Sequence, residues 1–549
     1  MNRRTLIKQL GLSVPGYLLS KQAGASFLKD LDQPAAGPFQ PTWESLQNYT
    51  VPEWYRNAKF GIWAHWGPQC EPEHGDWYGR GMYEEGSDHY KYHVQKYGHP
   101  SKFGFKDVIH QWKAEKWDPD QLVALYKRVG AKYFFAMANH HDNLDLWNSK
   151  YQSWNSVNVG PKKDLIGGWA KAAKKQGLPF GVSVHAAHAW TWYEVAQGSD
   201  KNGPLAGIPY DGKLTKTDGK ARLNDAVGQG AWWLGMDPQE LYAQNHALSK
   251  NGLQWEWNNG TTLPSKEYCD KFLKRTLELI DKYEPELLYF DDTVLPFHGL
   301  NDVGLQLAAH HYNQSMKRNK GMLKAVVNGK ILNEMQRKCL VWDIERGQSN
   351  VIEPFTWQTD TCIGGWHYDK RLYENKKYKS AQTVVHTLAD IVSKNGNLLL
   401  NIPVKGNGSI DDLEVAILEE IAAWMKINAE CIFDTRPWKV YGEGPAISEA
   451  APIAAQGFNE GKGKPFGAAD MRFTTKGDTL YAIVFGWPNN GKVAIKSLSD
   501  GNTLRPGAVS KIELVGGGEL HFQRNSEALE VMLPENRPAL TYANVLKIS

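Results

Sequence analysis

The most constraining feature of this sequence is an alternation of short apolar runs with amphipathic helical patterns between about residues 51 and 403. In the helical segment WDPDQLVALYKRVG, Asp118 is placed to cap the helix, Pro119 suits its first turn and Gly130 can end it. Strands that alternate with helices predict a parallel sheet, and about eight such units predict a closed (β/α)8-type barrel. The runs expected as strands are KFGIWAH, KYFFAMA, LPFGVSVH, ELLYFDD, MLKAVVN, CLVWDIE and NLLLNIP.

This pattern divides the chain into a barrel domain, expected over residues 40–437, and a C-terminal domain, expected over residues 438–549. Near Gly442 it changes to short alternating runs separated by turns, as in MRFTTKGDTLYAIVFGW, which predict a small antiparallel β-sandwich. Within the barrel, residues 197–262 form a stretch rich in Gly, Lys and Asp. We interpret it as a long insertion on the active-site face, with a surface excursion as the alternative.

The first 30 residues resemble an export signal of the twin-arginine type. Arg3 and Arg4 precede a weakly apolar stretch, and small residues near Ala25 mark the expected cleavage point. Lys, Gln, Ser and Pro interrupt the apolar stretch, so it does not have the composition of a transmembrane helix. We therefore expect a periplasmic or secreted protein, with an ordinary basic tail as the alternative.

Charge and cysteine content exclude several classes of protein. The 63 Lys and Arg residues nearly balance the 60 Asp and Glu residues, so the basic excess typical of nucleic-acid binding is absent. The five cysteines are scattered without metal-ligand spacing, which predicts neither a disulfide framework nor a zinc site. We expect no metal or organic cofactor, whereas an oligomer is compatible with this composition. The 22 tryptophans suit the C–H faces of sugars, although many must belong to the core.

Polar residues stand at the ends of most of the expected strands. In a (β/α)8 barrel the active site forms at the carboxyl ends of the strands, so these side chains are expected to share one polar, sugar-sized pocket. A structural histidine is the alternative for each single position. The residues in question are His65, His140, His141, His185, Asp291, Glu345 and Asn401.

Carboxylates at these strand ends predict glycoside hydrolysis, for which two acids flanking a sugar are the minimum. Asp291 and Asp292 directly follow LLYF, and their side chains must point to opposite sides, so one of them faces the pocket. Asp343 and Glu345 share one face of VWDIE, with Glu345 further out along the strand.

From about Trp43 to Trp438 the sequence resembles glycoside hydrolase family 29, the retaining α-L-fucosidases. The resemblance implies hydrolysis of terminal α-L-fucosides in an oligosaccharide or polysaccharide by double displacement through a covalent glycosyl-enzyme. No cofactor, nucleic acid or membrane span is implied. The motifs that carry it, in the family's order and spacing, are FGIWAHWG, HHDNLDLWNSKYQSWN, LLYFDD, GNLLLNIPVKGNGSI and CIFDTRPW.

The resemblance assigns the catalytic roles to Asp291 as nucleophile and Glu345 as acid/base, with Asp292 standing where the family usually has Gly. The glutamates that compete with Glu345 are Glu73, Glu84, Glu85 and Glu353. Lys330 is the charge closest to the position of the family's arginine near strand six. The residues expected to bind substrate are His65, Trp77, Tyr78, His140, His141, His185 and Trp366.

Two alternatives remain at this point. An α-L-galactosidase acting on algal-type galactans would use the same machinery, because L-fucose is L-galactose without the 6-hydroxyl. His185 and His188 occur where the family suggests tyrosine and serine, and such polar groups could bind a 6-hydroxyl. A non-catalytic carbohydrate-binding protein is the second alternative, although Asp291 and Glu345 are both present.

Overall fold

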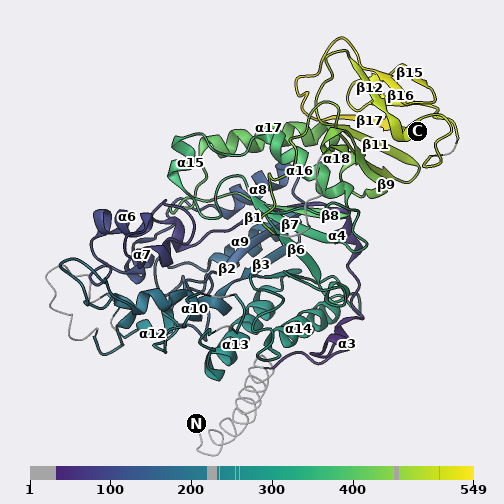
Figure 1. Ribbon diagram of the computed structural model, residues 1–549. Helices are drawn as coiled ribbons and strands as arrows, with labels where there is room; N and C mark the ends of the chain where they lie inside the picture. Colours follow the sequence, from purple (N-terminus) through teal and green to yellow (C-terminus); the bar gives the residue numbers. More distant parts are fainter. Residues whose placement is uncertain are drawn as a thin grey trace, which may run out of the picture.

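The computed structural model describes residues 33–218, 232–233, 235–253, 255–258, 260–449, 457–505 and 507–549. The expected export segment, residues 1–30, lies outside the described residues. A large central barrel is followed by a smaller β-rich unit that carries the C-terminus (Figure 1). Within the described ranges, no helix combines the length and the apolar composition that crossing a membrane requires.

Eight parallel strands close into a barrel in sequential order, which confirms the expected fold class. β1 pairs with β2 on one side and with β8 on the other, so that Trp63 lies beside both Phe135 and Asn401. All but one of the barrel-strand residues are buried, as strands covered on both faces require. The strands are β1 (Phe60–Ala64), β2 (Tyr133–Asn139), β3 (Phe180–Val184), β4 (Leu287–Phe290), β5 (Val326–Gly329), β6 (Val341–Glu345), β7 (Trp357–Cys362) and β8 (Gly396–Asn401).

Amphipathic helices cover much of the barrel, and their ends follow the local chemistry of the sequence. Asp118 caps α8 by accepting a hydrogen bond from the Gln121 amide, and Gly130 ends it in the left-handed conformation. Short helices α3 (Trp43–Leu46) and α4 (Glu53–Ala58) precede β1. The long helices are α8 (Pro119–Val129), α9 (Leu165–Gln176), α13 (Lys266–Tyr283), α14 (Val303–Arg318), α16 (Ala381–Ser393) and α17 (Asp412–Asn428).

The barrel departs from regular alternation between β5 and β7. In this described stretch the connection from β5 to β6 contains only the 3-10 turn η5 (Gln336–Lys338), and the connection from β6 to β7 contains no helix. Further short helices surround the loops after β1, β3 and β7. These are η1 (Pro68–Cys70), α5 (Tyr78–Gly81), α6 (Asp88–Tyr97), α7 (Phe105–Gln111), η2 (Ala186–His188), α10 (Ala189–Trp192), η3 (Tyr193–Gln197), η4 (Asp211–Lys213), α12 (Pro238–Leu241) and α15 (Lys370–Glu374).

The C-terminal unit consists of two antiparallel sheets with a separate apolar core, as expected for a small β-sandwich. The six-stranded sheet has the order β14-β13-β17-β11-β10-β9, and the three-stranded sheet has the order β12-β16-β15. Its first strand begins at Arg436, close to the boundary expected at residue 438. The strands are β9 (Arg436–Glu443), β10 (Met471–Lys476), β11 (Thr479–Val484), β12 (Lys492–Ile495), β13 (Ile512–Leu514), β14 (Gly518–Glu519), β15 (Phe522–Arg524), β16 (Leu529–Met532) and β17 (Asn544–Ile548).

A buried ion-pair network joins this unit to helix α16 of the barrel. The two carboxylate oxygens of Asp390 accept from Arg472 Nε at 2.6 Å and from Lys394 Nζ at 2.7 Å. Burial alone would raise the pKa of Asp390, but the two cations outweigh it and hold the pKa below its usual range. Because Arg472 lies on β10, the network ties the position of the β-sandwich to the barrel wall.

We expect the Asp390→Ala variant to be destabilised by about 3–5 kcal/mol, because the change leaves two buried cations without their carboxylate. Since folding depresses the Asp390 pKa, its stabilisation is present above the unfolded-state pKa of about 3.9 and is lost as pH falls below it. Urea unfolding at pH 7 measures the effect. Glu374→Ala, which breaks the exposed pair with Lys370, is the control and should unfold like the wild type.

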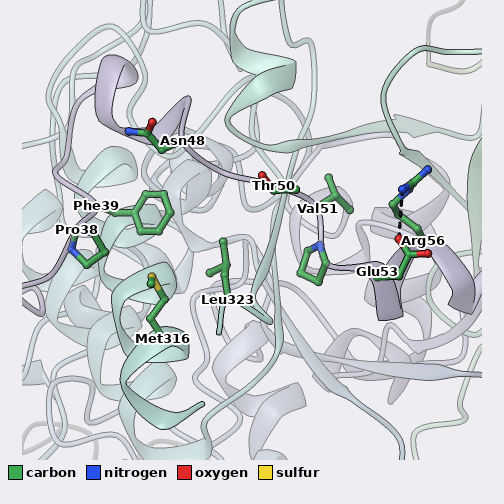
Figure 2. A pocket seen from close by; sticks show the side chains of 10 residues that line it. Pro38, Phe39, Asn48, Thr50, Val51, Glu53, Arg56, Met316 and Leu323 are labelled. Carbon is green, nitrogen blue, oxygen red and sulfur yellow. Dashed lines mark hydrogen bonds and ion pairs between the residues drawn. The ribbon is translucent and has the colours of Figure 1, made fainter. Parts of the chain in front are cut away.

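A shallow groove of about 460 Å³ lies beside α4 and the end of α14, and Figure 2 shows its lining. Phe39, Met316 and Leu323 give it an apolar side, whereas Glu53 and Arg56 form an ion pair at one end. α4 precedes β1 and α14 precedes β5, so the groove borders the amino-terminal end of the barrel. Active sites in this fold form at the opposite end.

Candidate active site

A cavity of about 1150 Å³ opens at the carboxyl end of the barrel. Residues that directly follow β1, β2, β3, β4, β5 and β6 line it, as do residues from the loop after β7. This is where the strand-end residues were expected to meet. The lining residues from the strand ends and the loop after β7 include His65, His140, His185, Asp291, Asp292, Lys330, Glu345, Trp366 and His367.

Asp291, the first residue after β4, is surrounded by three nitrogen groups. Its Oδ1 accepts from Lys330 Nζ at 2.6 Å, and its Oδ2 lies 2.9 Å from His185 Nδ1 and 3.1 Å from His141 Nε2. Burial alone would raise the pKa of Asp291, but the Lys330 ammonium and the two imidazoles hold it well below its usual range. Asp291 is therefore ionised, and a fifth of its side-chain surface faces the cavity.

Glu345, the last residue of β6, contacts the same Lys330 ammonium as Asp291. Lys330 Nζ donates to Glu345 Oε2 as well as to Asp291 Oδ1. Burial would lower the pKa of Lys330, but the surrounding carboxylates raise it well above its usual value, so the group is a permanent ammonium. Of the glutamates in the described part of the chain, Glu345 alone lines the cavity.

The competing glutamates are engaged elsewhere. Glu84 pairs with Arg80, and Glu85 accepts from the Lys201 and Asn202 amides at the surface. Glu353 accepts from Ser349 Oγ in the loop before β7. The backbone of Glu73 bonds to Cys70 and Lys370 and has the left-handed φ of 56°. None of these places a carboxyl beside Asp291.

Two further acids, Asp343 and Asp360, lie beside this pair in the floor of the cavity. Asp360 Oδ2 accepts from Tyr289 Oη at 2.8 Å, and Asp343 Oδ1 accepts from Gln358 Nε2 at 2.7 Å. Burial raises the pKa of Asp343 to about 7 and that of Asp360 well above its usual value. Asp360 therefore holds a proton at neutral pH, and Asp343 is about half protonated there, which limits the negative charge around Lys330.

Uncharged imidazoles form the next part of the lining. Burial lowers the pKa of His65 and His140 well below the usual value, so both rings are neutral. Within the described residues, neither ring nitrogen of the buried His65 has a hydrogen-bond partner, and the equally buried His367 has only the Asp76 carboxylate, whose Oδ1 lies 3.6 Å from His367 Nδ1. Buried polar atoms are normally satisfied, so these nitrogens are suited to bind the hydroxyls of a ligand.

Tryptophans complete the cavity. Trp77, the N-cap residue before helix α5, has the left-handed conformation with φ of 61°, and its ring centroid lies 5.9 Å from that of Trp255. Trp366 lies 5.5 Å from Trp63, the inward residue of β1. Indole faces pack against the C–H faces of sugar rings, and the adjacent imidazoles provide the polar contacts. Trp255 belongs to the stretch 197–262, so this described residue of the insertion lies at the active-site face.

Two of the residues expected to bind substrate are placed differently. Tyr78 is fully buried, and its hydroxyl pairs with His93 Nδ1 at 2.8 Å on helix α6, so it supports the loop behind Trp77. His141 contacts Asp291 through Nε2 and the His185 carbonyl oxygen through Nδ1, so both of its nitrogens are used within the protein beside Asp291. Tyr78 therefore does not line the cavity in this structure, and a contact between Tyr78 and the sugar stays a prediction.

Asp292 turns to the opposite side from Asp291, as strand alternation requires. Its Oδ1 accepts from the Thr293 amide at 2.7 Å and lies 3.1 Å from His188 Nε2. His188 in turn stacks on Trp257, with ring centroids 4.6 Å apart. Asp292 is therefore held by its neighbours, whereas Asp291 faces the cavity.

Three of these histidines bring ring nitrogens within 4.8 Å of one another, the spacing that a metal ion could bridge: His65, His140 and His185. However, His185 already uses Nδ1 for Asp291 and Nε2 for Ser183 Oγ, and His140 Nδ1 pairs with Gln69. Only His65 offers two nitrogens that no other side chain uses. This group of three histidines therefore fits hydroxyl groups better than a cation.

Sequence reasoning did not assign several residues that line the cavity. Asp360 belongs to β7, whose alternation of Gln358, Asp360 and Cys362 does not have the pattern of a buried strand. His367 directly follows the expected Trp366, and its amide donates to Asp76 Oδ1 at 2.5 Å. Phe458 comes from the segment before β10 and has no local signal in the sequence.

Comparisons with known proteins agree with this geometry. The family model described as alpha-L-fucosidase matches residues 26–430, and the one described as the alpha-L-fucosidase C-terminal domain matches residues 465–549. An alpha-L-fucosidase of Branchiostoma floridae is 26% identical over 471 residues, which cover 83% of this chain and 84% of that protein. Human tissue alpha-L-fucosidase is 24% identical over 510 residues, covering 91% and 89% respectively.

Solved structures give the same result. The crystal structure of Thermotoga maritima alpha-fucosidase is 26% identical, covers 93% of this chain and 100% of its own, and superposes with a TM-score of 0.65. The complex of that enzyme with fucose matches with a TM-score of 0.64 at 25% identity, and covers the same shares of both chains. The barrel, its carboxylate-lined cavity and both family models lead to one conclusion: this chain belongs to the α-L-fucosidase family of glycoside hydrolases.

Proposed function

We propose that this chain is an exported, retaining exo-α-L-fucosidase in which Asp291 is the nucleophile and Glu345 the general acid and base. The observation that carries the proposal is the single ammonium of Lys330, which contacts both carboxylates. Asp291 Oδ1 and Glu345 Oε2 contact the same nitrogen, so these two oxygens lie within about 5 Å of each other. Carboxyl groups are roughly 5–5.5 Å apart in retaining enzymes and roughly 6.5–9.5 Å apart in inverting ones, so the separation favours retention.

The proposed reaction proceeds in two displacements. Asp291, kept ionised by its three nitrogen neighbours, attacks the anomeric carbon while Glu345 gives its proton to the departing glycosidic oxygen. Glu345 then removes a proton from water, which attacks the same carbon and releases the sugar and the free Asp291 carboxylate. His65, His140 and His367 are proposed to bind hydroxyls of the terminal sugar, with Trp77 and Trp366 against its ring. His141 and His185 are proposed to position Asp291.

Proton NMR of the first product measures the stereochemistry directly. We expect α-L-fucose to form first from an α-L-fucoside, because two inversions at one carbon give net retention. β-L-Fucose as the first product would contradict the double displacement. The same assay with an α-L-galactoside compares the two candidate sugars.

L-Galactosides are the weaker candidate for a structural reason. That alternative depended on His185 and His188 offering hydrogen bonds to a 6-hydroxyl. Instead, His185 uses both ring nitrogens within the protein, and His188 lies against Asp292 and Trp257. The relatives are also named for fucose. We therefore propose α-L-fucosides as the substrates, and hydrolysis of an α-L-galactoside at an equal rate would contradict this choice.

Export to the periplasm or the medium is the remaining part of the proposal. It depends on the twin-arginine-like residues Arg3 and Arg4 and the small residues near Ala25. Cell fractionation with an activity assay tests it. A full-length protein found only in the cytoplasmic fraction would contradict export without affecting the catalytic proposal.

Lys330 makes a testable contribution to the pH dependence. Removing the ammonium in Lys330→Met raises the pKa of Asp291, since a neighbouring cation lowers a carboxyl pKa by about 1–3 units. The free enzyme needs Asp291 ionised, so the acidic limb of kcat/KM should move to higher pH by that amount. Lys330→Arg keeps the charge and serves as the control. An acidic limb at the same pH in both variants would show that Lys330 does not set the Asp291 pKa.

A further inference from the structure

Three large residues stand at the mouth of the cavity in a backbone conformation that side chains rarely adopt. Ile331, Arg346 and Phe458 have φ values of 51°, 45° and 58°. Left-handed backbone is unfavourable for bulky residues and most of all for β-branched ones such as Ile331. The two apolar side chains are also exposed, Ile331 by 73% and Phe458 by 61%. Such strain persists where the surrounding structure imposes it, and it clusters at binding sites.

Phe458 is held at this position by the segment Gly457–Glu460. The Phe458 amide donates to the Glu345 carbonyl oxygen at 2.7 Å, and the Glu460 amide donates to that of Arg346 at 2.8 Å. Asn459, which is fully buried, exchanges two hydrogen bonds with the backbone of Gln348. The segment is therefore anchored through Asn459, while the ring of the adjacent Phe458 is turned outward.

The side chain of Glu460 fixes the other end of this segment. Its carboxylate accepts from Lys379 Nζ at 2.6 Å and from Thr361 Oγ1 at 3.0 Å. Gly457–Glu460 lies between β9 and β10, so it comes from the C-terminal part of the chain. One wall of the cavity mouth is thus supplied from outside the barrel sequence.

We propose that Phe458 and Ile331 form the binding site for the sugar unit that leaves with the departing oxygen, an uncharged pyranose that presents its C–H face. This inference rests on the proposed function. Glu345 must reach the glycosidic oxygen, and the next sugar is attached to that oxygen, so it emerges beside Glu345. Phe458 is bonded to the backbone of Glu345, and both residues line the same cavity. An aromatic face and an aliphatic side chain suit the C–H face of a pyranose.

The size of the cavity supports an extended site. At about 1150 Å³ it exceeds the roughly 300–1,000 Å³ of most small-molecule pockets. The acids and neutral histidines occupy its inner part, whereas Ile331 and Phe458 are exposed apolar lining residues beside β5 and β6, where Asn333 is exposed as well. The inner part is thus polar enough for the terminal sugar, and the mouth is apolar enough for the face of the next one.

The test compares two substrates with the same terminal sugar. α-L-Fucosyl fluoride has a one-atom leaving group that cannot reach the mouth, whereas an α-L-fucosyl disaccharide carries a second pyranose there. Phe458→Asn removes the ring, and Asn tolerates left-handed backbone, so the change does not add strain. We expect kcat/KM for the disaccharide, divided by that for the fluoride, to fall about 3- to 10-fold. Ile331→Asn should act in the same direction.

Controls separate the possible outcomes. Phe458→Tyr keeps the ring and should keep the ratio, and Phe355→Ala removes a partly exposed ring outside the cavity and should leave it unchanged. An unchanged ratio in both Asn variants, or equal losses on both substrates, would overturn the inference. Failure of the proposed function is seen separately, as a wild-type protein that does not hydrolyse α-L-fucosyl fluoride. The same pair of substrates, built on the sugar that it does hydrolyse, then tests the site.

Discussion

The Asp291→Gly variant is expected to lose at least about 10⁴ in kcat on an α-L-fucoside, the order of loss seen when a catalytic nucleophile is removed. Asp291 directly follows β4, and its carboxylate, which Lys330 and His185 contact, is open to the cavity. The remaining charge of Lys330 still faces Glu345, so the fold should be kept. Steady-state kinetics and circular dichroism measure the two quantities.

Azide gives this prediction a stereochemical signature. A small anion can occupy the space of the missing carboxylate and attack an activated α-L-fucoside directly, so β-L-fucosyl azide should form. In the wild type, a 2-fluoro analogue that traps the intermediate should label a peptide containing Asp291. Asp292→Asn is the neighbouring control, because Asp292 is held by His188 and Thr293. An inactive Asp292→Asn beside an active Asp291→Gly would assign the nucleophile to the other acid.

Glu345→Ala is expected to slow hydrolysis of fucosyl disaccharides by about 10²–10⁴-fold, the usual contribution of a general acid. Substrates with an activated aryl leaving group need little protonation, so their first step should be nearly normal. The second step then lacks its base, and the glycosyl-enzyme accumulates, which lowers KM as well as kcat.

Azide should rescue the activated substrate in this variant and give α-L-fucosyl azide, because it attacks the covalent intermediate on the face that the leaving group vacated. The two azide products thus distinguish the roles of Asp291 and Glu345 by their opposite anomers. Glu353→Ala, which removes a glutamate bonded to Ser349 outside the cavity, is the matched control. Normal hydrolysis of disaccharides by Glu345→Ala would move the acid role to another residue.

The barrel could be predicted from the sequence because seven of its strands have the apolar composition of buried strands. β7 is the exception, since Trp357–Cys362 contains Gln358, Thr359, Asp360 and Thr361. These polar residues are stable there only because neighbouring strands satisfy them: Gln358 bonds to Asp343, and Thr359 to the Ile344 carbonyl oxygen. A local pattern does not show partners in another strand, so the sequence pointed to Trp366 in the loop that follows β7 but predicted no strand there.

For the candidate site, the sequence likewise predicts where residues lie along the strands but not which way their side chains point. The sequence places His185 and Asp291 at strand ends, but their contact depends on the β3–β4 register, in which Val184 lies beside Phe290. That register turns His185 toward Asp291 and not toward a ligand hydroxyl. Phe458 is harder still, because 112 residues separate it from Glu345, and only the folded β-sandwich brings the two together.

The ammonium of Lys330 keeps the electrostatic environment of the proposed reaction nearly constant. Asp291 is negative at the start; in the glycosyl-enzyme its charge has disappeared into an ester, and Glu345, having given up its proton, is negative instead. At each stage Lys330 therefore contacts one negatively charged carboxylate, first that of Asp291 and then that of Glu345. Little solvent or protein dipole has to reorient around the site as bonds change. The rate of both displacements should consequently depend on the fixed geometry of β4, β5 and β6, and hardly on the ionic strength outside.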